Sequence, residues 1–301
     1  MGHNQPKITG EHIDQIRQMI ITNPSWNRTR LSKELCALWD WRSPVGQIKD
    51  ISCRDLLRTL DKKGLISLPA ANWLPRAPGK GSDKIKYIEH DTSPINTDLN
   101  ELMPLRIRIV TSKQDAELFK SYIHQYHYLK FDRSIGENMK YLVCSSSGAI
   151  LSCLMFGSAA WSCADRDCYI GWNKEHKRDG LAFVSNNQRF LVNPWINVQN
   201  LASHILGAIA RRISCDWQEK YGHPLFLLET FVDRRFRGTC YKAANWRHIG
   251  ETTGRGRNST TCEQVLPIKY ILLYPLCGGF RERLCGNADG ANGLEEGVRR
   301  G

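Results

Sequence analysis

The sequence predicts an α+β protein with a small helical domain followed by a larger domain built on a mixed β-sheet. Its 301 residues suffice for one large and one small domain. Hydrophobic residues form 41% of the chain, which is enough to build a core and argues against a disordered polybasic tail. Apolar positions recur first at helical spacing and later in short extended runs that alternate with helical ones.

Residues 1–69 are expected to form a winged helix-turn-helix domain that binds DNA. Three segments with helical spacing precede one short extended run: 12–22, 28–39, 53–63 and 65–69. Three short helices followed by a strand are the outline of this fold, in which the third helix faces the DNA groove and phosphates. Its candidate contact residues are Arg54, Arg58, Lys62 and Lys63. The alternative is a dimerisation or protein-contact module with solvated basic residues.

Residues 70–104 are expected to be a linker, because they are rich in Pro, Gly, Lys and Asp and show little periodicity. A core domain should then span residues 105–275. The glycine-rich and charged residues 276–301 should form a flexible C-terminal tail.

Strands and helices alternate within the expected core domain. The predicted strands lie at 105–110, 141–144, 150–156, 189–192, 226–232 and from Ile249 onward. The predicted helices lie at 115–128, 201–217 and 239–246. The second and third strands are separated by Ser-Ser-Ser-Gly, a hairpin signal. This order predicts a central mixed sheet covered by helices.

The chain is strongly basic. It carries 42 Lys and Arg against 30 Asp and Glu, a formal net charge of +12. Such an excess repels itself in the folded state and favours a polyanionic partner, either nucleic acid or an acidic membrane. The alternative is a basic protein that is merely soluble. No apolar run approaches the roughly 18 residues of a membrane span and the N-terminus is no signal peptide, so the expected location is the cytoplasm.

The 11 cysteines are expected to be mostly reduced thiols of the core. Their number is odd, and no C-x-x-C pair occurs. Cys163 and Cys168 lie close in sequence, and His124 or His127 could join them, but the spacing matches no common zinc site.

Residues 234–257 are the densest basic segment. They hold seven Arg or Lys against one acid, Glu251, with Tyr241 and Trp246 interleaved. Cations bind phosphates and aromatic faces stack on unpaired bases, so this composition favours a DNA strand or a distorted duplex. The expected DNA contacts of the core domain are Arg189, Arg234, Arg237, Lys242, Trp246, Arg247, Arg255 and Arg257. The alternative is a solvated loop after a helix.

Three carboxylates could form a catalytic metal site. Glu229 and Asp233 straddle a strand end, where sites on mixed sheets often form, and Asp167 lies in another dense motif beside Asp165. If Asp167, Glu229 and Asp233 converge, they would hold Mg²⁺, the one cofactor considered, and support phosphodiester cleavage. Alternatively, these acids pair with arginines and fix loops. The candidate arginines are Arg166, Arg189, Arg234 and Arg237.

A tyrosine that attacks phosphorus is the second catalytic option, through a covalent DNA intermediate. Tyr126, Tyr128 and Tyr241 are the candidates. Core packing or base stacking is the commoner role of a tyrosine. The chain is therefore either a non-catalytic DNA-binding subunit or a nuclease or strand-transfer enzyme. In the second case its catalytic residues would be Glu229, Asp233, Asp167 and Tyr241.

The order of elements in the core domain resembles the GCN5-related acetyltransferase (GNAT) fold. The phrase YKAANWRHIG at 241–250 is similar to the closing helix and strand of those enzymes. The resemblance implies a GNAT-like core. An acetyltransferase needs a glycine-containing loop before its long helix, so that backbone amides reach the coenzyme pyrophosphate. Residues 193–197, NPWIN, contain no glycine and a proline that lacks a donor, so acyl transfer is the weakest of the three hypotheses.

Seven phrases in order resemble the DruA family, named for the Druantia anti-phage system. They are YHYL (126–129), DRDCYIGW (165–172), NNQRFL (186–191), NLAS (200–203), ETFVD (229–233), GTCYKAANW (238–246) and GRGR (254–257). The resemblance covers most of residues 10–275. It implies a bacterial anti-phage or mobile-element system, and a partner such as a helicase or another defence subunit. It implies no particular chemistry.

Overall fold

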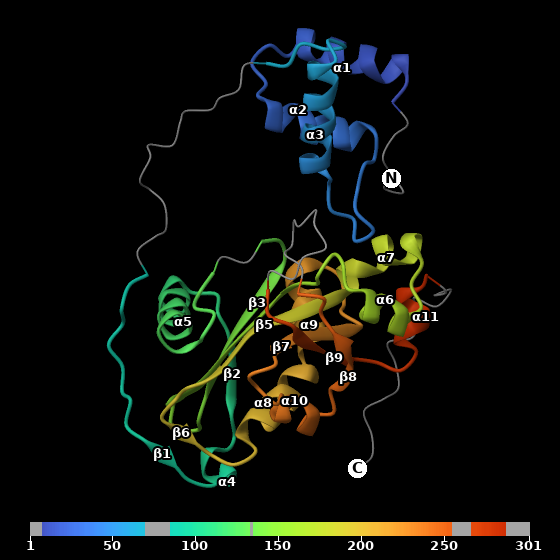
Figure 1. Ribbon diagram of the computed structural model, residues 1–301. Coiled ribbons are helices and arrows are strands. Elements are labelled where there is room, and N and C mark those ends of the chain that lie inside the picture. Colours follow the sequence, from blue (N-terminus) through green and yellow to red (C-terminus); the bar gives the residue numbers. More distant parts are fainter. Residues whose placement is uncertain (1–7, 70–84, 133–134, 255–265, 287–301) are drawn as a thin grey trace. The chain divides into compact units, whose positions relative to one another are not determined.

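The structure is a computed structural model that describes residues 8–69, 85–132, 135–254 and 266–286 (Figure 1). The chain divides into two compact units, Met1–Asp83 and Lys84–Gly301. In the described part of the chain, no helix combines the length and the apolar character needed to cross a bilayer.

The first unit consists of three helices, in the places that helical spacing predicted. They are α1 (Gly10–Thr22), α2 (Arg28–Leu38) and α3 (Asp50–Lys62). Asn27 caps α2 by accepting a hydrogen bond from the Arg30 amide, which satisfies one of the free donors of its first turn. The apolar faces of the helices meet in one core around Ile16, Leu35 and Leu57.

The expected strand at 65–69 is not formed, so the described residues contain no wing strand after α3. Side chains of the helices bind this backbone instead. Asp61 accepts from the Leu68 amide, and Arg17 and Arg28 donate to the carbonyl groups of Leu65 and Pro69. A strand needs a partner strand, whereas these polar side chains hold a single extended segment against the helices.

The second unit is built on a seven-stranded mixed sheet. Its strands, in spatial order, are β2 (Arg106–Ile109), β3 (Asn138–Cys144), β4 (Ile150–Ser158), β5 (Val184–Val192), β7 (Leu227–Asp233), β9 (Lys269–Pro275) and β8 (Arg247–Glu251). Only β5 and β7 pair in parallel among neighbours of this sheet. The predicted central mixed sheet is therefore confirmed. The sequence did not predict β9, the strand that lies between β7 and β8.

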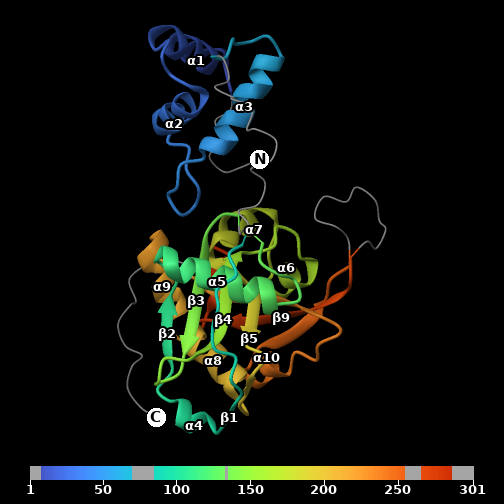
Figure 2. The same ribbon diagram turned by 90° about the vertical axis from the view of Figure 1, so that its left-hand side faces the viewer.

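Helices cover both faces of the sheet. They are α4 (Leu99–Leu102), α5 (Lys113–Tyr126), α6 (Ala164–Ile170), α7 (Lys174–Gly180), α8 (Leu201–Ala210), α9 (Ile213–Tyr221), α10 (Thr239–Ala243) and α11 (Phe280–Leu284). Helices α8, α9 and α10 pack on the largest apolar cluster, on one face. Helix α5 lies across the other face, the one turned to the viewer in Figure 2. Two adjacent residues of β7, Leu227 and Leu228, belong to different clusters because side chains alternate along a strand.

Three segments that the sequence predicted have other boundaries in the structure. The expected linker includes described residues that pack on the second unit: β1 (Ile95–Asn96) pairs in parallel with β6 (Ile196–Asn197). The expected tail begins with α11, whose Phe280 and Leu284 are buried, whereas 287–301 lie outside the described residues. The single helix expected at 201–217 is two helices, α8 and α9. The first two differences arise from single apolar residues in otherwise polar sequence segments. Burial of these side chains stabilises an ordered structure although the composition is typical of a loop.

The pairing of β5 with β7 is short, and this positions the site. It joins Val184–Asn186 to Leu227–Glu229 only, although both strands continue. Beyond this point side chains bridge the two strands: Thr230 donates to the main-chain oxygen of Asn187. The second half of β7 and the turn that follows it are consequently free to present side chains outside the ladder with β5.

Candidate nucleic-acid interface

The buried carboxylate of Glu229 is bound by an arginine. Arg166 and Glu229 are both fully buried, and the Arg166 Nη1 donates to Glu229 Oε2 at 2.8 Å. The Ala160 amide donates to Glu229 Oε1 at 2.7 Å. Arg166 also donates to Asp167 Oδ1, and Lys177 lies 2.7 Å from Asp167 Oδ2. Burial raises the pKa of Glu229, and the positive charge of Arg166 opposes that rise.

Asp233 has a different partner. Arg235 donates to both of its carboxylate oxygens, and the Arg235 amide donates to Oδ1. These hydrogen bonds hold the pKa of Asp233 below its ordinary value. Among the described residues, no three His, Cys, Asp or Glu side chains are grouped so that they could hold a metal ion. The arrangement of Asp167, Glu229 and Asp233 is thus the alternative one, in which the acids pair with arginines.

Tyr241 is part of the core. It lies within α10 and is 8% exposed, and its hydroxyl donates to Asn187 Oδ1 at 2.5 Å. Burial raises the pKa of Tyr241, which disfavours the phenolate that attack on phosphorus requires. Of the other two candidates, Tyr126 is hydrogen-bonded to His90 Nε2, and Tyr128 is 42% exposed.

The expected DNA contacts of the second unit fall into three groups. Four lie exposed in or after the turn that follows β7: Arg234, Arg237, Lys242 and Arg247. Arg255 and Arg257 lie outside the described residues. Trp246 and Arg189 are less accessible. Trp246 is 4% exposed and packs against Tyr241 in the core, so its ring is not exposed for the expected stacking on bases. Arg189 is half-buried, and its guanidinium donates to the carbonyl groups of Gln188 and Lys130.

The basic residues expected to read DNA in the first unit lie on α3 and just after it. Arg54 pairs with Asp50 and Arg58 with Asp55, one helical turn earlier in each case. Lys62 and Lys63 are exposed at the end of the helix. Acidic neighbours therefore offset two of the four positive charges.

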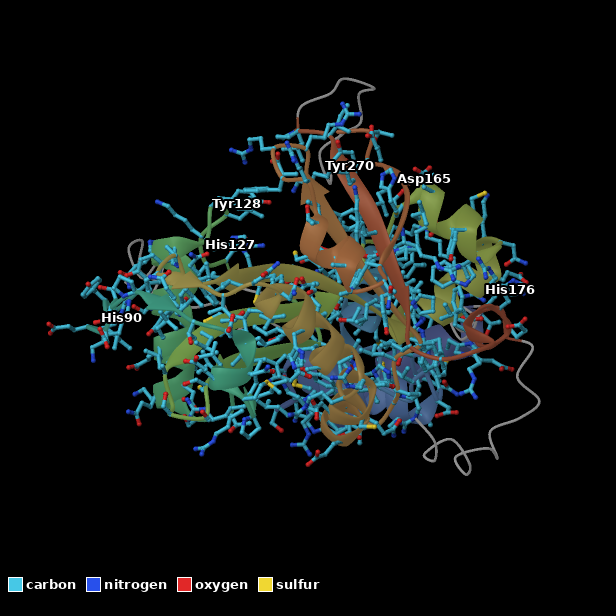
Figure 3. All side chains as sticks on the ribbon, turned by 90° about the horizontal axis from the view of Figure 1, so that it is seen from below. His90, His127, Tyr128, Asp165, His176 and Tyr270 are labelled. Atoms are coloured by element: carbon cyan, nitrogen blue, oxygen red, sulfur yellow. The ribbon has the colours of Figure 1, made fainter. Side chains whose placement is uncertain are left out.

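A compact exposed surface follows β7, and we call Tyr128, Arg234, Arg235, Phe236 and Arg237 the β7-turn surface. The three arginines and Phe236 are consecutive residues of the turn between β7 and α10. Tyr128 comes from the segment after α5 and points toward β7 and β9 in Figure 3. Its ring lies 5.1 Å from that of Phe236, and the Arg235 guanidinium lies 5.3 Å from its centroid.

Two of the three arginines of the β7-turn surface pair with acids. Arg234 pairs with Glu251, and Arg235 with Asp233. Arg237 forms no ion pair within the part of the chain that the structure describes, and its side chain is exposed. An open cavity of about 530 Å³ adjoins this surface, lined by Asp233, Arg234, Arg235, Pro267 and Ile268.

Part of the loop before α8 is already hydrogen-bonded within the protein. The amides of Asn193 and Ile196 already donate to main-chain carbonyl groups, those of Leu151 and Asn193. Pro194 has no amide hydrogen. β1 lies along this loop, because Ile95 donates to the Trp195 carbonyl and pairs with Ile196. Two amides of this loop are therefore engaged and one is missing, at a place where a pyrophosphate needs free amides.

A family model described as Druantia protein DruA matches residues 59–283. The chain belongs to the DruA family. This match confirms the resemblance that the seven short sequence phrases indicated, and it suggests a role in a Druantia defence system. The match begins within α3, so it covers the whole second unit up to α11 and little of the first.

Acetyltransferases are among the solved structures to which the chain is similar. A spermidine N-acetyltransferase from Vibrio cholerae, in complex with CoA and spermine, is 6% identical, with a TM-score of 0.39 over 57% of this chain and 95% of that chain. Arabidopsis thaliana NAA60 in complex with acetyl-CoA is 10% identical, with a TM-score of 0.40 over 57% and 98%. Values this low say nothing about activity. No curated protein matches the chain.

The sequence did not single out two residues of the β7-turn surface, Arg235 and Phe236, and it offered Tyr128 as a candidate nucleophile with core packing or base stacking as the alternative. Tyr128 and Phe236 are 108 positions apart, so only the fold brings their rings together. The available signal was the run RRFR at 234–237, in which an aromatic residue interrupts three arginines directly after a buried strand.

Proposed function

We propose that this chain is a DNA-binding component of an anti-phage or mobile-element system, and that it binds DNA through the β7-turn surface. The observation that carries the proposal is the exposure of Arg234, Arg235 and Arg237 on one short turn. Phosphate groups are the natural partners of clustered guanidinium groups. The formal net charge of +12 supports a polyanionic partner, because it attracts DNA from every direction of approach.

The first unit is proposed to add a second contact in the manner of a helix-turn-helix domain. Its third helix carries the basic residues that would approach the groove and phosphates. Lys62 and Lys63 are its exposed cations, and Arg54 and Arg58 would exchange their acidic partners for phosphates. Two weak contacts on one chain reinforce each other, because binding of the first raises the effective concentration of the second.

The chain is proposed to act without cleaving DNA, and to deliver DNA to a partner such as a helicase or another defence subunit. Support comes from Glu229 and Tyr241, which engage Arg166 and Asn187 in the core. Neither group is available for chemistry unless these hydrogen bonds break. A Mg²⁺-dependent nuclease activity that disappears in Glu229→Gln would overturn this part of the proposal.

The test compares DNA binding by the full-length protein with that of two double variants. Arg234→Ala with Arg237→Ala removes two charges from the β7-turn surface while leaving Arg235 to hold Asp233. Arg106→Ala with Lys113→Ala is the matched control, because both residues are exposed and Arg106 lies on β2, the opposite edge strand from β8. Fluorescence anisotropy of a labelled duplex and of its single strand is measured from about 50 to 200 mM salt, because phosphate contacts weaken over this range.

The surface variant should bind both DNAs more weakly and lower the slope of log K against log salt by about 1 to 2 units. The control should keep the slope within about half a unit, as expected where no phosphate contact is lost. Equal effects of the two double variants would contradict the proposed surface. Arg255→Ala with Arg257→Ala tests the basic residues that lie outside the described part of the chain.

A further inference from the structure

The aromatic half of the β7-turn surface has a property that phosphate binding does not use. Tyr128 is 42% exposed and Phe236 is 46% exposed, although both rings are large and apolar. Their centroids lie 5.1 Å apart at an interplanar angle of 50°. Exposing two apolar rings to water is unfavourable, and covering them with another flat group lowers the free energy.

The Tyr128 ring is supported from within the protein. His127 stacks on it at 4.8 Å with an interplanar angle of 27°. The His127 Nδ1 accepts a hydrogen bond from the Leu129 amide, which fixes the orientation of the imidazole. A ring with a fixed neighbour loses little conformational freedom on binding, so more of the stacking free energy appears as affinity.

One arginine lies over both rings, and two more lie on the same turn. The Arg235 guanidinium lies 5.3 Å from the Tyr128 centroid and 5.9 Å from that of Phe236. Arg234 and Arg237 flank the same turn and are exposed. A base can stack on an aromatic ring or on a guanidinium plane while its phosphate pairs with a neighbouring arginine. The base faces of a B-form duplex are hidden in its stack, so a duplex offers only phosphates and groove edges to such a surface.

We propose that Tyr128 and Phe236 form a stacking site for an unpaired base, so that the β7-turn surface prefers single-stranded DNA or a base displaced from a duplex. This inference rests on the proposed function and names the form of DNA that it takes. Exposed aromatic rings contribute to single-strand binding largely independently of sequence, because every base has a π-face. The site should therefore distinguish strand state rather than base sequence.

The experiment uses the full-length protein, a fluorescein-labelled 20-nucleotide strand of mixed sequence, and the same strand annealed to its complement. Tyr128→Ala should weaken single-strand binding about tenfold, within the range for loss of one stacked base, and duplex binding less than about twofold. Tyr128→Phe keeps the ring and should restore single-strand binding. Tyr87→Ala is the matched control, because Tyr87 is a tyrosine that is 71% exposed elsewhere on the second unit.

A second readout reports stacking directly. A single strand with 2-aminopurine at its centre should lose fluorescence on binding to the unaltered protein, and less so with Phe236→Ala. Equal losses of single-strand and duplex affinity in Tyr128→Ala, or unchanged single-strand affinity, would overturn the stacking site. If the arginine variant weakens both DNAs while Tyr128→Ala changes neither, only this inference fails. If the arginine variant has no effect on either DNA, the proposed function itself fails.

Discussion

Arg166 and Glu229 form a fully buried ion pair, with 2.8 Å between Nη1 and Oε2, and it ties α6 to β7. A buried charge without its partner is far more costly than the pair is favourable. We therefore expect Arg166→Met to lower the free energy of unfolding by about 3–5 kcal/mol, measured by chemical denaturation. Arg108→Met is the control, since Arg108 forms a half-exposed pair with Asp115 and should cost at most about 1 kcal/mol.

The combination of Arg166→Met with Glu229→Leu sharpens this test. Replacing both charges removes the uncompensated carboxylate, so the double variant should be more stable than Arg166→Met alone. If the losses of the two single variants simply add, the side chains do not interact as the structure describes.

Tyr241 and Asn187 provide the second expectation. Tyr241→Phe removes a buried hydroxyl donor and leaves Asn187 Oδ1 without it, which should cost about 1–3 kcal/mol of unfolding free energy. DNA affinity should stay within about twofold of that of the unaltered protein, because the substitution removes no DNA contact. Tyr87→Phe, at an exposed tyrosine, should leave both quantities unchanged. A covalent protein–DNA product that forms with the unaltered protein and is lost in Tyr241→Phe would contradict the buried role.

The three N-terminal helices and the mixed sheet could be predicted because their apolar residues repeat at the period of a helix or a strand. The site could not be predicted as well. Glu229 and Arg166 are 63 positions apart, and a carboxylate that binds a metal looks the same in sequence as one that binds an arginine. Segments 95–104 and 280–284 look like loops by composition, yet single apolar side chains such as Leu102 and Phe280 bury them against the sheet.

His127 supplies a pH dependence whose sign can be derived. Its burial, and the nearby charge of Arg189, lower the pKa of His127 from 6.5 to about 4. The unfolded chain takes up this proton as the pH falls below about 6.5, whereas the folded chain takes it up only near 4. The contribution of His127 to stability is therefore complete above the unfolded pKa and is lost as the pH falls through this window.

We expect the unfolding free energy of His127→Gln to decline less than that of the unaltered protein between about pH 7 and pH 4.5, as measured by denaturant titration. The variant has no imidazole to protonate in this window. His248→Gln removes an exposed histidine of β8 and serves as the control. Parallel pH profiles for the unaltered protein and His127→Gln would show that the imidazole is accessible to protons in the folded state.

Trp246 separates core packing from DNA contact. It is 4% exposed and lies between Tyr241 and Tyr274, with ring centroids 5.1 and 5.8 Å away. Trp246→Ala should cost about 3–5 kcal/mol of unfolding free energy, because it opens a large cavity beside α10. Within the described residues the indole Nε1 has no hydrogen-bond partner, so Trp246→Phe loses packing but no hydrogen bond and should be the milder change. Trp246→Phe should bind single-stranded DNA as tightly as the unaltered protein by anisotropy. A loss of affinity of about tenfold, as expected for one stacked base, would instead indicate that Trp246 contacts DNA, as its position in the basic segment predicted.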